Sequence, residues 1–146
     1  MKIRNMSIND YKAVYCLWMS IPGLGLNNLD DSKDGVEKYL KRNPTTCFVA
    51  EENNKIIGVI MSGHDGRRGF IYHTAVHKNY RKHGIANKLV NHAIKALEVE
   101  GINKVALVVF EDNKLGNAFW EKIGFKDRLD LIYRNKEICQ LSRIDT

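Results

Sequence analysis

One stretch near the middle of the chain has the spacing of an amphipathic helix, and it constrains the fold more than any other feature. Its apolar residues recur at intervals of three and four: Ile85, Ala86, Leu89, Val90, Ala93, Ile94 and Leu97. Gly101 supplies a stop signal after it. A strand candidate precedes it at residues 70–76, and a Val-rich strand candidate follows it at residues 104–110. A strand, a helix of this length and a strand predict a crossover that joins two parallel strands.

The rest of the chain alternates between short strand patterns and helix patterns. Further strands are expected at residues 2–5, 46–51 and 56–62, with one or two more at 129–133 and 137–141; further helices are expected at 10–20, 33–42 and 114–123. The central strands form an antiparallel meander. The sequence therefore predicts an α/β fold with a single mixed, mostly antiparallel sheet flanked by helices, in one domain that spans residues 1–146.

Composition excludes several classes of protein. The chain has 146 residues, of which 44% are hydrophobic and 27% charged, as in an ordinary globular domain. Its longest apolar run, residues 105–110, is far shorter than the ~20 residues that span a membrane, and its N-terminus does not read as a signal peptide. Three scattered cysteines indicate neither a disulfide framework nor a zinc ribbon, which favours a cytoplasmic protein. The net charge of +6 favours an anionic partner.

The most informative short segment is the basic loop at residues 79–86, which lies between a strand and the central helix. It combines Arg81 and Lys82 with a glycine, Gly84, and with the free N–H groups of a helix start. Such N–H groups, together with the helix dipole, bind phosphate well. A solvated basic turn is the alternative interpretation.

The spacing Arg81-x-x-Gly84-x-Ala86, in this setting, resembles the acetyl-CoA signature of the GNAT superfamily of N-acyltransferases. A second signature of that family is an Asn followed by a helix that ends in an aromatic pair, Glu-Lys and Gly-Phe. Asn113 and residues 118–125 match it, and the order of elements agrees over nearly the whole chain. The middle segment most resembles small bacterial acetyltransferases of the YpeA type.

This resemblance implies a site for acetyl-CoA between two splayed central strands. The strand that ends at Val76 would be bulged, and the pantetheine arm would bind along it as an added strand does. The residues so implied in cofactor binding are Thr74, Ala75, Val76, Arg81, Lys82, His83, Gly84, Ile85, Ala86, Asn113, Phe119, Trp120 and Lys122. For Phe119 and Trp120, packing in the core is the alternative.

The resemblance also implies acetyl transfer to a primary amine by direct attack in a ternary complex, with the Val76 N–H as the oxyanion donor. Many family members carry Tyr where this chain has Trp120, and an indole N–H does not serve as a general acid. The remaining candidates for acid and base are, in order, Tyr72, His73, Glu111 and Tyr133. Strand alternation predicts that Tyr72 and Thr74 share one face and that His73 points to the other. A packing or surface role is the alternative for each, and an acyl-CoA-binding sensor without turnover is the alternative function.

The acceptor is expected to be an amine-bearing small molecule or protein. In the resembling family the first helices and their loop form the acceptor wall. Here Leu24, Leu26 and Leu29 either cover an apolar part of the substrate or pack on the core. Asp30, Asp31 and Asp34 either attract a cationic amine or belong to a solvated loop with a helix-capping Asp.

Other partners have less support in the sequence. A nucleic-acid or membrane partner lacks a motif, and a homodimer is among the assemblies common in the family. No metal is expected, because His73 and His77 lie on a strand and the loop after it, without a third ligand.

Overall fold

Five strands form one mixed sheet in the order β1–β2–β3–β4–β5, and the computed structural model describes the chain over residues 1–145. The strands are β1 (Lys2–Asn5), β2 (Phe48–Glu52), β3 (Lys55–His64), β4 (Gly69–Val76) and β5 (Val105–Ala106). The first four pair antiparallel, whereas β4 and β5 pair in parallel. The α/β class, the mostly antiparallel sheet and the parallel crossover are therefore as the sequence predicts.

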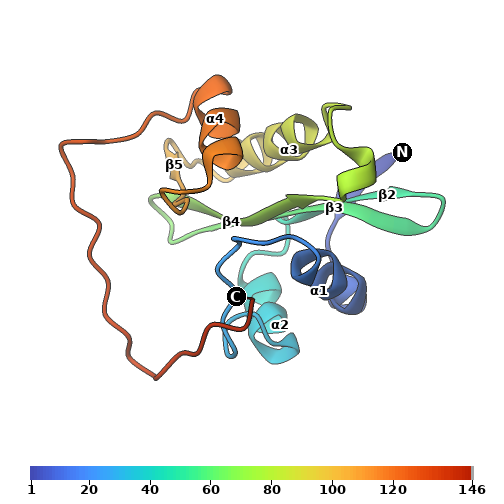
Figure 1. The fold of residues 1–146 in the computed structure, drawn as a ribbon, viewed down its shortest axis with the longest axis horizontal. Helices are drawn as coiled ribbons and strands as arrows, with labels where there is room; N and C mark the ends of the chain where they lie inside the picture. The colour runs from blue at the N-terminus through green and yellow to red at the C-terminus, as the bar shows by residue number, and fades with distance from the viewer. Residues whose placement is uncertain (146) are drawn as a thin grey trace.

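Helices cover both faces of this sheet, as Figure 1 shows. One face carries α1 (Tyr11–Met19) and α2 (Lys33–Arg42), and the other carries α3 (Ile85–Val99) and α4 (Lys114–Lys122). Each face has its own apolar core, with Trp18 fully buried in the first and Leu89 fully buried in the second. Within residues 1–145, no helix is both long enough and apolar enough to cross a bilayer.

β4 contains a bulge at His73. Val59 of β3 pairs with Ala75 and Met61 pairs with Tyr72, so β4 has one residue more than β3 over this stretch. His73 takes up the extra residue with a φ of 43°, in the left-handed region that L-residues seldom adopt.

Because of the bulge, the side chains of Tyr72 and His73 point to the same face of the sheet. The His73 ring packs edge-on against Trp18 of α1 with 5.2 Å between centroids, and the Tyr72 ring packs against Tyr39 of α2 at 5.8 Å. Both side chains therefore face α1 and α2. The prediction that they point to opposite faces is wrong, because simple alternation does not hold across a bulge.

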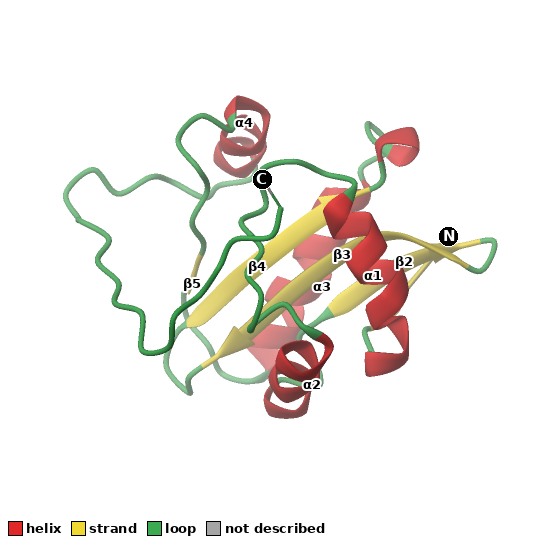
Figure 2. Cartoon of the chain, turned by 60° about the horizontal axis from the view of Figure 1, so that its bottom comes forward, coloured by secondary structure: helices red, strands yellow, loops and turns green. Residues whose placement is uncertain are grey.

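The C-terminal third forms fewer strands than the sequence predicts. β5 covers two residues instead of residues 104–110, because its pairing with β4 stops there. Residues 129–133 and 137–141 form no strand and instead follow an outward arc (Figure 2), in which Leu129 is 91% exposed and Ile138 fully exposed. Alternating apolar residues form a strand when a neighbouring strand and a buried face are present. The apolar residues of this arc have no neighbouring strand and no buried face within residues 1–145.

The first turn of α2 is packed tightly against the loop before it. Alanine in place of glycine ordinarily stabilises a helix interior by about 1 kcal/mol. A Cβ on Gly35, however, would collide with the carbonyl oxygens of Leu29 and Asp30. We therefore expect Gly35→Ala to lower the free energy of unfolding by about 1–3 kcal/mol in urea titrations. Lys38→Ala, in the same helix, is the control and should change it little; a Gly35→Ala protein as stable as the wild type would contradict this packing.

A partly buried ion pair ties β1 to the start of α1. Arg4 donates from Nη1 and Nη2 to the two oxygens of Asp10 at 2.9 and 2.8 Å, and the Ser7 N–H adds a third bond at 2.9 Å. Burial by itself would raise the pKa of Asp10, but the Arg4 guanidinium and the Ser7 N–H hold that pKa below its ordinary value. The carboxylate thus stabilises the fold above its unfolded pKa of ~3.9 and loses this effect as the pH falls through the lower folded value.

We expect Asp10→Asn to lower stability at neutral pH by roughly 1–3 kcal/mol, because Arg4 loses a charged partner. The variant should also lose less of its remaining stability than the wild type between about pH 5 and about pH 2. Thermal melts across that range measure both effects. Asp127→Asn, at an exposed position in the C-terminal arc, should follow the wild-type curve; parallel curves for Asp10→Asn and the wild type would exclude this role for the ion pair.

Candidate functional site

The loop between β4 and α3 has the features of a phosphate site. Lys82 and Gly84 adopt φ values of 66° and 75°, which turn the backbone into the helix. Gly84 caps α3 without a side-chain hydrogen bond, so the first N–H groups of the helix keep their donor capacity. The Arg81 and Lys82 side chains are exposed beside them. Donors, helix dipole and basic side chains thus lie together at one helix start, as the sequence predicts.

Other residues of this loop hold its shape. His83 bonds through Nδ1 to the carbonyl of Tyr80 at 3.1 Å. Ile85 is buried against the core under α3, and Ala86 is half-buried in the first helical turn. His83 and Ile85, which the sequence implied in cofactor binding, therefore hold the backbone of this loop in place.

The end of β4 presents a free backbone edge. The His77 N–H donates to the Ile57 carbonyl at 2.8 Å, and along an antiparallel ladder successive residues point their polar groups to opposite edges. The N–H and carbonyl of Val76 therefore point away from β3, to the side from which β5 has already diverged. On that side Arg81 Nε donates to the Val76 carbonyl at 3.3 Å. The Val76 N–H faces the same edge, where an extended ligand can bond to the strand.

Thr74 gives an independent sign that this edge is built for a ligand. Its hydroxyl is buried and has no hydrogen-bond partner within residues 1–145. Buried hydroxyls nearly always have a partner, because an unpaired one is costly. A bulged strand with a free edge, an unpaired hydroxyl and a basic helix start fit the pantetheine arm and the phosphates of acetyl-CoA.

The second signature lies on α4, and part of it serves the fold. Asn113 Oδ1 caps α4 by accepting the Gly116 N–H at 2.9 Å. Phe119 and Trp120 pack edge-on at 5.0 Å and rest on the apolar core under α3. Lys122 is exposed. Core packing thus accounts for both aromatic residues, whereas Lys122 is free to meet an anion.

Tyr72 lies in an aromatic cluster on the face covered by α1 and α2. Its ring centroid lies 4.8 Å from that of Phe70 and 5.8 Å from that of Tyr39. Partial burial raises the pKa of Tyr72, and the charges of Tyr133, Asp30 and Asp31 raise it further. At neutral pH the phenol therefore keeps its proton and acts as a hydrogen-bond donor.

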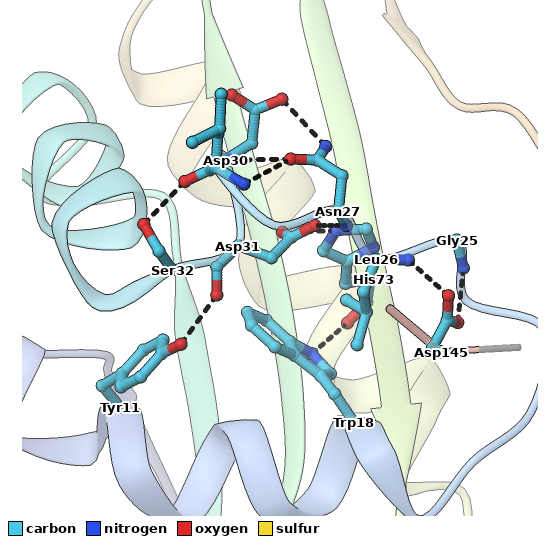
Figure 3. A network of polar contacts seen from close by, with 11 residues as sticks. Tyr11, Trp18, Gly25, Leu26, Asn27, Asp30, Asp31, Ser32, His73 and Asp145 are labelled. Atoms are coloured by element: carbon cyan, nitrogen blue, oxygen red, sulfur yellow. Dashed lines mark hydrogen bonds and ion pairs between the residues drawn. The ribbon is translucent and has the colours of Figure 1, made fainter. Parts of the chain in front are cut away.

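His73 is bonded to the buried carboxylate of Asp31, a residue that the sequence offers either as an attractor for a cationic amine or as part of a solvated loop. His73 Nε2 and Asp31 Oδ1 are 2.8 Å apart, and their side chains are only 12% and 5% exposed. The Trp18 indole donates to the His73 carbonyl at 3.2 Å and holds the bulge from below (Figure 3). Nothing local distinguished Asp31 from Asp30, because the contact spans 42 residues of sequence.

The acceptor loop, which we define as residues 21–32 between α1 and α2, is held by the end of the chain. Asp145 accepts the N–H groups of Gly25 and Leu26 at 2.8 and 2.9 Å (Figure 3), and the Ile144 N–H donates to the Leu26 carbonyl. Leu26 is fully buried in the core, whereas Leu29 is 44% exposed. Of the three leucines that the sequence offered as an acceptor wall, Leu26 and the half-buried Leu24 pack on the core and Leu29 is accessible.

The two remaining catalytic candidates lie in exposed chain. Tyr133 is 65% exposed on the C-terminal arc, close enough for its charge to raise the pKa of Tyr72. Glu111 is exposed just beyond Phe110, whose ring stacks under the Arg143 guanidinium at 4.7 Å. The structure thus brings Tyr72, His73 and Tyr133 to one side of β4.

Comparison with known proteins agrees with this geometry. The sequence pattern of the acetyltransferase (GNAT) family matches residues 12–125. An acetyltransferase of Pectobacterium atrosepticum is 35% identical over 140 residues, which cover 96% of this chain and 97% of that protein.

Solved structures share the fold at lower sequence identity. The PaiA N-acetyltransferase of Thermoplasma acidophilum, in complex with coenzyme A, superposes with a TM-score of 0.72 at 20% identity and covers 86% of this chain and 89% of its own. AAC(6')-Iy, in complex with the bisubstrate analogue CoA-S-monomethyl-acetylneamine, also superposes with a TM-score of 0.72. It is 19% identical, and the superposition covers 93% of this chain and 97% of AAC(6')-Iy. With a fold of this kind and a match that extends over most of its length, the chain belongs to the acetyltransferase (GNAT) family.

Proposed function

We propose that this protein transfers the acetyl group of acetyl-CoA to a primary amine, by direct attack in a ternary complex, and that the whole chain works as one N-acetyltransferase domain of the YpeA type. The observation that carries the proposal is the unpaired Thr74 hydroxyl on the bulged, free-edged strand. This strand leads directly into the basic start of α3. The family match supports acyl transfer as the chemistry.

On the cofactor side, residues 74–76 would hold the pantetheine arm, and residues 81–86 would hold the pyrophosphate. Lys122 and the Asn113 amide would border them from α4. Acetyl-CoA supplies an acyl group activated as a thioester. The Val76 N–H, on the free edge, would donate to the thioester carbonyl oxygen as that oxygen gains negative charge.

On the acceptor side, Tyr72 has the properties of a proton donor to the departing thiolate. Its raised pKa keeps the phenol protonated at neutral pH. It lies two residues before Thr74 and faces α1 and α2, where the acceptor loop lies. Trp120 packs away from this cluster, on the α3 side, and so takes no part in proton transfer. Tyr133 and Glu111 are the rival groups.

Acetyl-CoA binding is the first test. By calorimetry, Arg81→Ala should weaken binding roughly tenfold or more, because one charge-assisted contact to phosphate is lost. Gly84→Asp should weaken it further, because it adds a negative charge and a side chain at a φ of 75°. Gly66→Asp is the matched control, since Gly66 also has a positive φ and open space around its Cα. Unchanged binding in both loop variants, or no binding by the folded wild type, would refute the proposal.

Turnover tests the role of Tyr72. Tyr72→Phe should lower kcat by roughly 100-fold or more, the usual range for losing a general acid, and should leave the Kd for acetyl-CoA unchanged. Tyr133→Phe tests the rival tyrosine and should have a small effect. Thiol release from acetyl-CoA with a panel of primary amines measures both. A wild type that binds acetyl-CoA and acetylates no amine would indicate a sensor, and a large loss in Tyr133→Phe alone would transfer the role to Tyr133.

A further inference from the structure

We infer that His73 takes the proton from the acceptor ammonium and that Asp31 is the residue that positions it, so that the two act as one unit. This inference rests on the proposed function and assigns the base of that reaction. Figure 3 shows His73 and Asp31 within their network of polar contacts. Tyr72 precedes His73 on β4, and their ring centroids lie 6.0 Å apart. The same strand continues into residues 74–76, which would hold the acyl donor.

The geometry of the pair is that of an oriented imidazole. Asp31 Oδ1 lies 2.8 Å from Nε2 of His73, and its other oxygen accepts the Asn27 N–H at 2.8 Å. A carboxylate that accepts this bond selects the neutral tautomer with its proton on Nε2, and we assign that tautomer to His73, which leaves a lone pair on Nδ1. Nδ1 makes no hydrogen bond to any residue within 1–145. A nitrogen with a free lone pair, fixed by a buried carboxylate, is what a general base requires.

The backbone around His73 is also held in an uncommon state. Its φ of 43° is unfavourable for a residue with a side chain, and such conformations persist where the surroundings enforce them. The Trp18 indole enforces it by bonding the His73 carbonyl. Without this bulge, alternation would direct the imidazole to the α3 face, away from Asp31.

Asp31 is itself fixed from two sides. The Tyr11 hydroxyl donates to its carbonyl at 2.7 Å, and the Asn27 N–H holds its second oxygen. The residues just before Asn27 are anchored by Asp145, whose carboxylate accepts two backbone N–H groups. The loop that carries the carboxylate thus has little freedom to move away from His73.

The proton balance follows from these positions. The acceptor R–NH3+ gives one proton to Nδ1 of His73, and the freed lone pair attacks the thioester carbon. The C–N bond forms, the C–S bond breaks, and the sulfur leaves with the bonding electron pair. Tyr72 gives its proton to the thiolate, and the second nitrogen proton restores the Tyr72 phenol. The imidazolium of His73 returns its proton to solvent. The products are the amide, CoA-SH and H+.

The first experiment needs no acceptor. In ¹H–¹⁵N spectra of uniformly labelled protein at neutral pH, His73 should show a protonated Nε2 and an unprotonated Nδ1. Asp31→Asn should abolish this single tautomer, because an amide can both donate to and accept from Nε2. Asp30→Asn should keep the single tautomer. A wild-type His73 that exchanges between tautomers would overturn the inference.

The second experiment measures kcat/KM against pH, with spermidine and with a short peptide bearing a free amino terminus as acceptors. Asn and Gly tolerate the positive φ, so His73→Asn and His73→Gly are the variants of choice. His73→Asn should lower kcat/KM by roughly 100-fold and Asp31→Asn by roughly tenfold, with acetyl-CoA affinity unchanged. Glu98→Gln, at an exposed carboxylate of α3 on the other face of the sheet, should stay within about twofold of the wild type.

The pH profile and chemical rescue separate chemistry from structure. Asp31 from the acceptor loop and Tyr72 from the same strand are the titratable groups that face His73, and α1 presents the Trp18 indole. A reaction that uses a general base loses rate when acid blocks that base, so wild-type kcat/KM should fall on acidification and His73→Asn should lose this dependence. Added imidazole should restore activity to His73→Gly. A purely structural role predicts neither result.

The failure of this inference is distinct from the failure of the proposed function. If the wild type does not bind acetyl-CoA, the proposed function itself is wrong. If it binds acetyl-CoA and turns over while His73→Asn retains full activity, the base lies elsewhere and the transferase assignment stands. A wild type that binds acetyl-CoA but acetylates neither acceptor would overturn His73 as a base for such amines.

Discussion

The hydrogen bond from the Trp18 indole to the His73 carbonyl holds a one-residue bulge, and both sides of the site depend on that bulge. At the bulge, the regular alternation of side chains is broken, so Tyr72 and His73 point to the same face of the sheet. Downstream, β4 continues beyond β5, with the polar groups of Val76 directed to a free edge. One local irregularity therefore separates the two sides that we propose for the acceptor and for the cofactor on a single strand.

The two sides differ in how they are assembled. The cofactor side comes from contiguous chain, because β4, the basic loop and the first turn of α3 follow one another directly. The acceptor side joins distant segments: α1 supplies Trp18, the acceptor loop supplies Asp31, and the end of the chain supplies Asp145. The first kind of site can be encoded in a short motif, whereas the second exists only in the folded chain.

This difference explains what could be predicted from the sequence. The bounds of α2, the start of α3 and the phosphate loop were predictable, because helix periodicity, capping residues and loop glycines are local signals. The expected strand at residues 129–133 was wrong. Alternation of apolar and polar residues shows that a segment is compatible with a strand, but it does not show whether a neighbouring strand is present to pair with it. The direction of His73 depended on a bulge, and the partner of Asp31 on a contact across 42 residues, so neither left a local signal.

The buried carboxylate couples the chemistry of the acceptor side to its folding. A carboxylate that is 5% exposed is costly to bury unless its charge is matched by donors. The donors to Asp31 come from the acceptor loop itself and from His73, and Asp145 holds that loop by accepting the N–H groups of Gly25 and Leu26. A half-formed acceptor side would leave that carboxylate unmatched, so these contacts form together. Because the residues proposed to bind the cofactor share only β4 with this network, changes in residues 21–32 or at the end of the chain would leave the geometry of those residues in place.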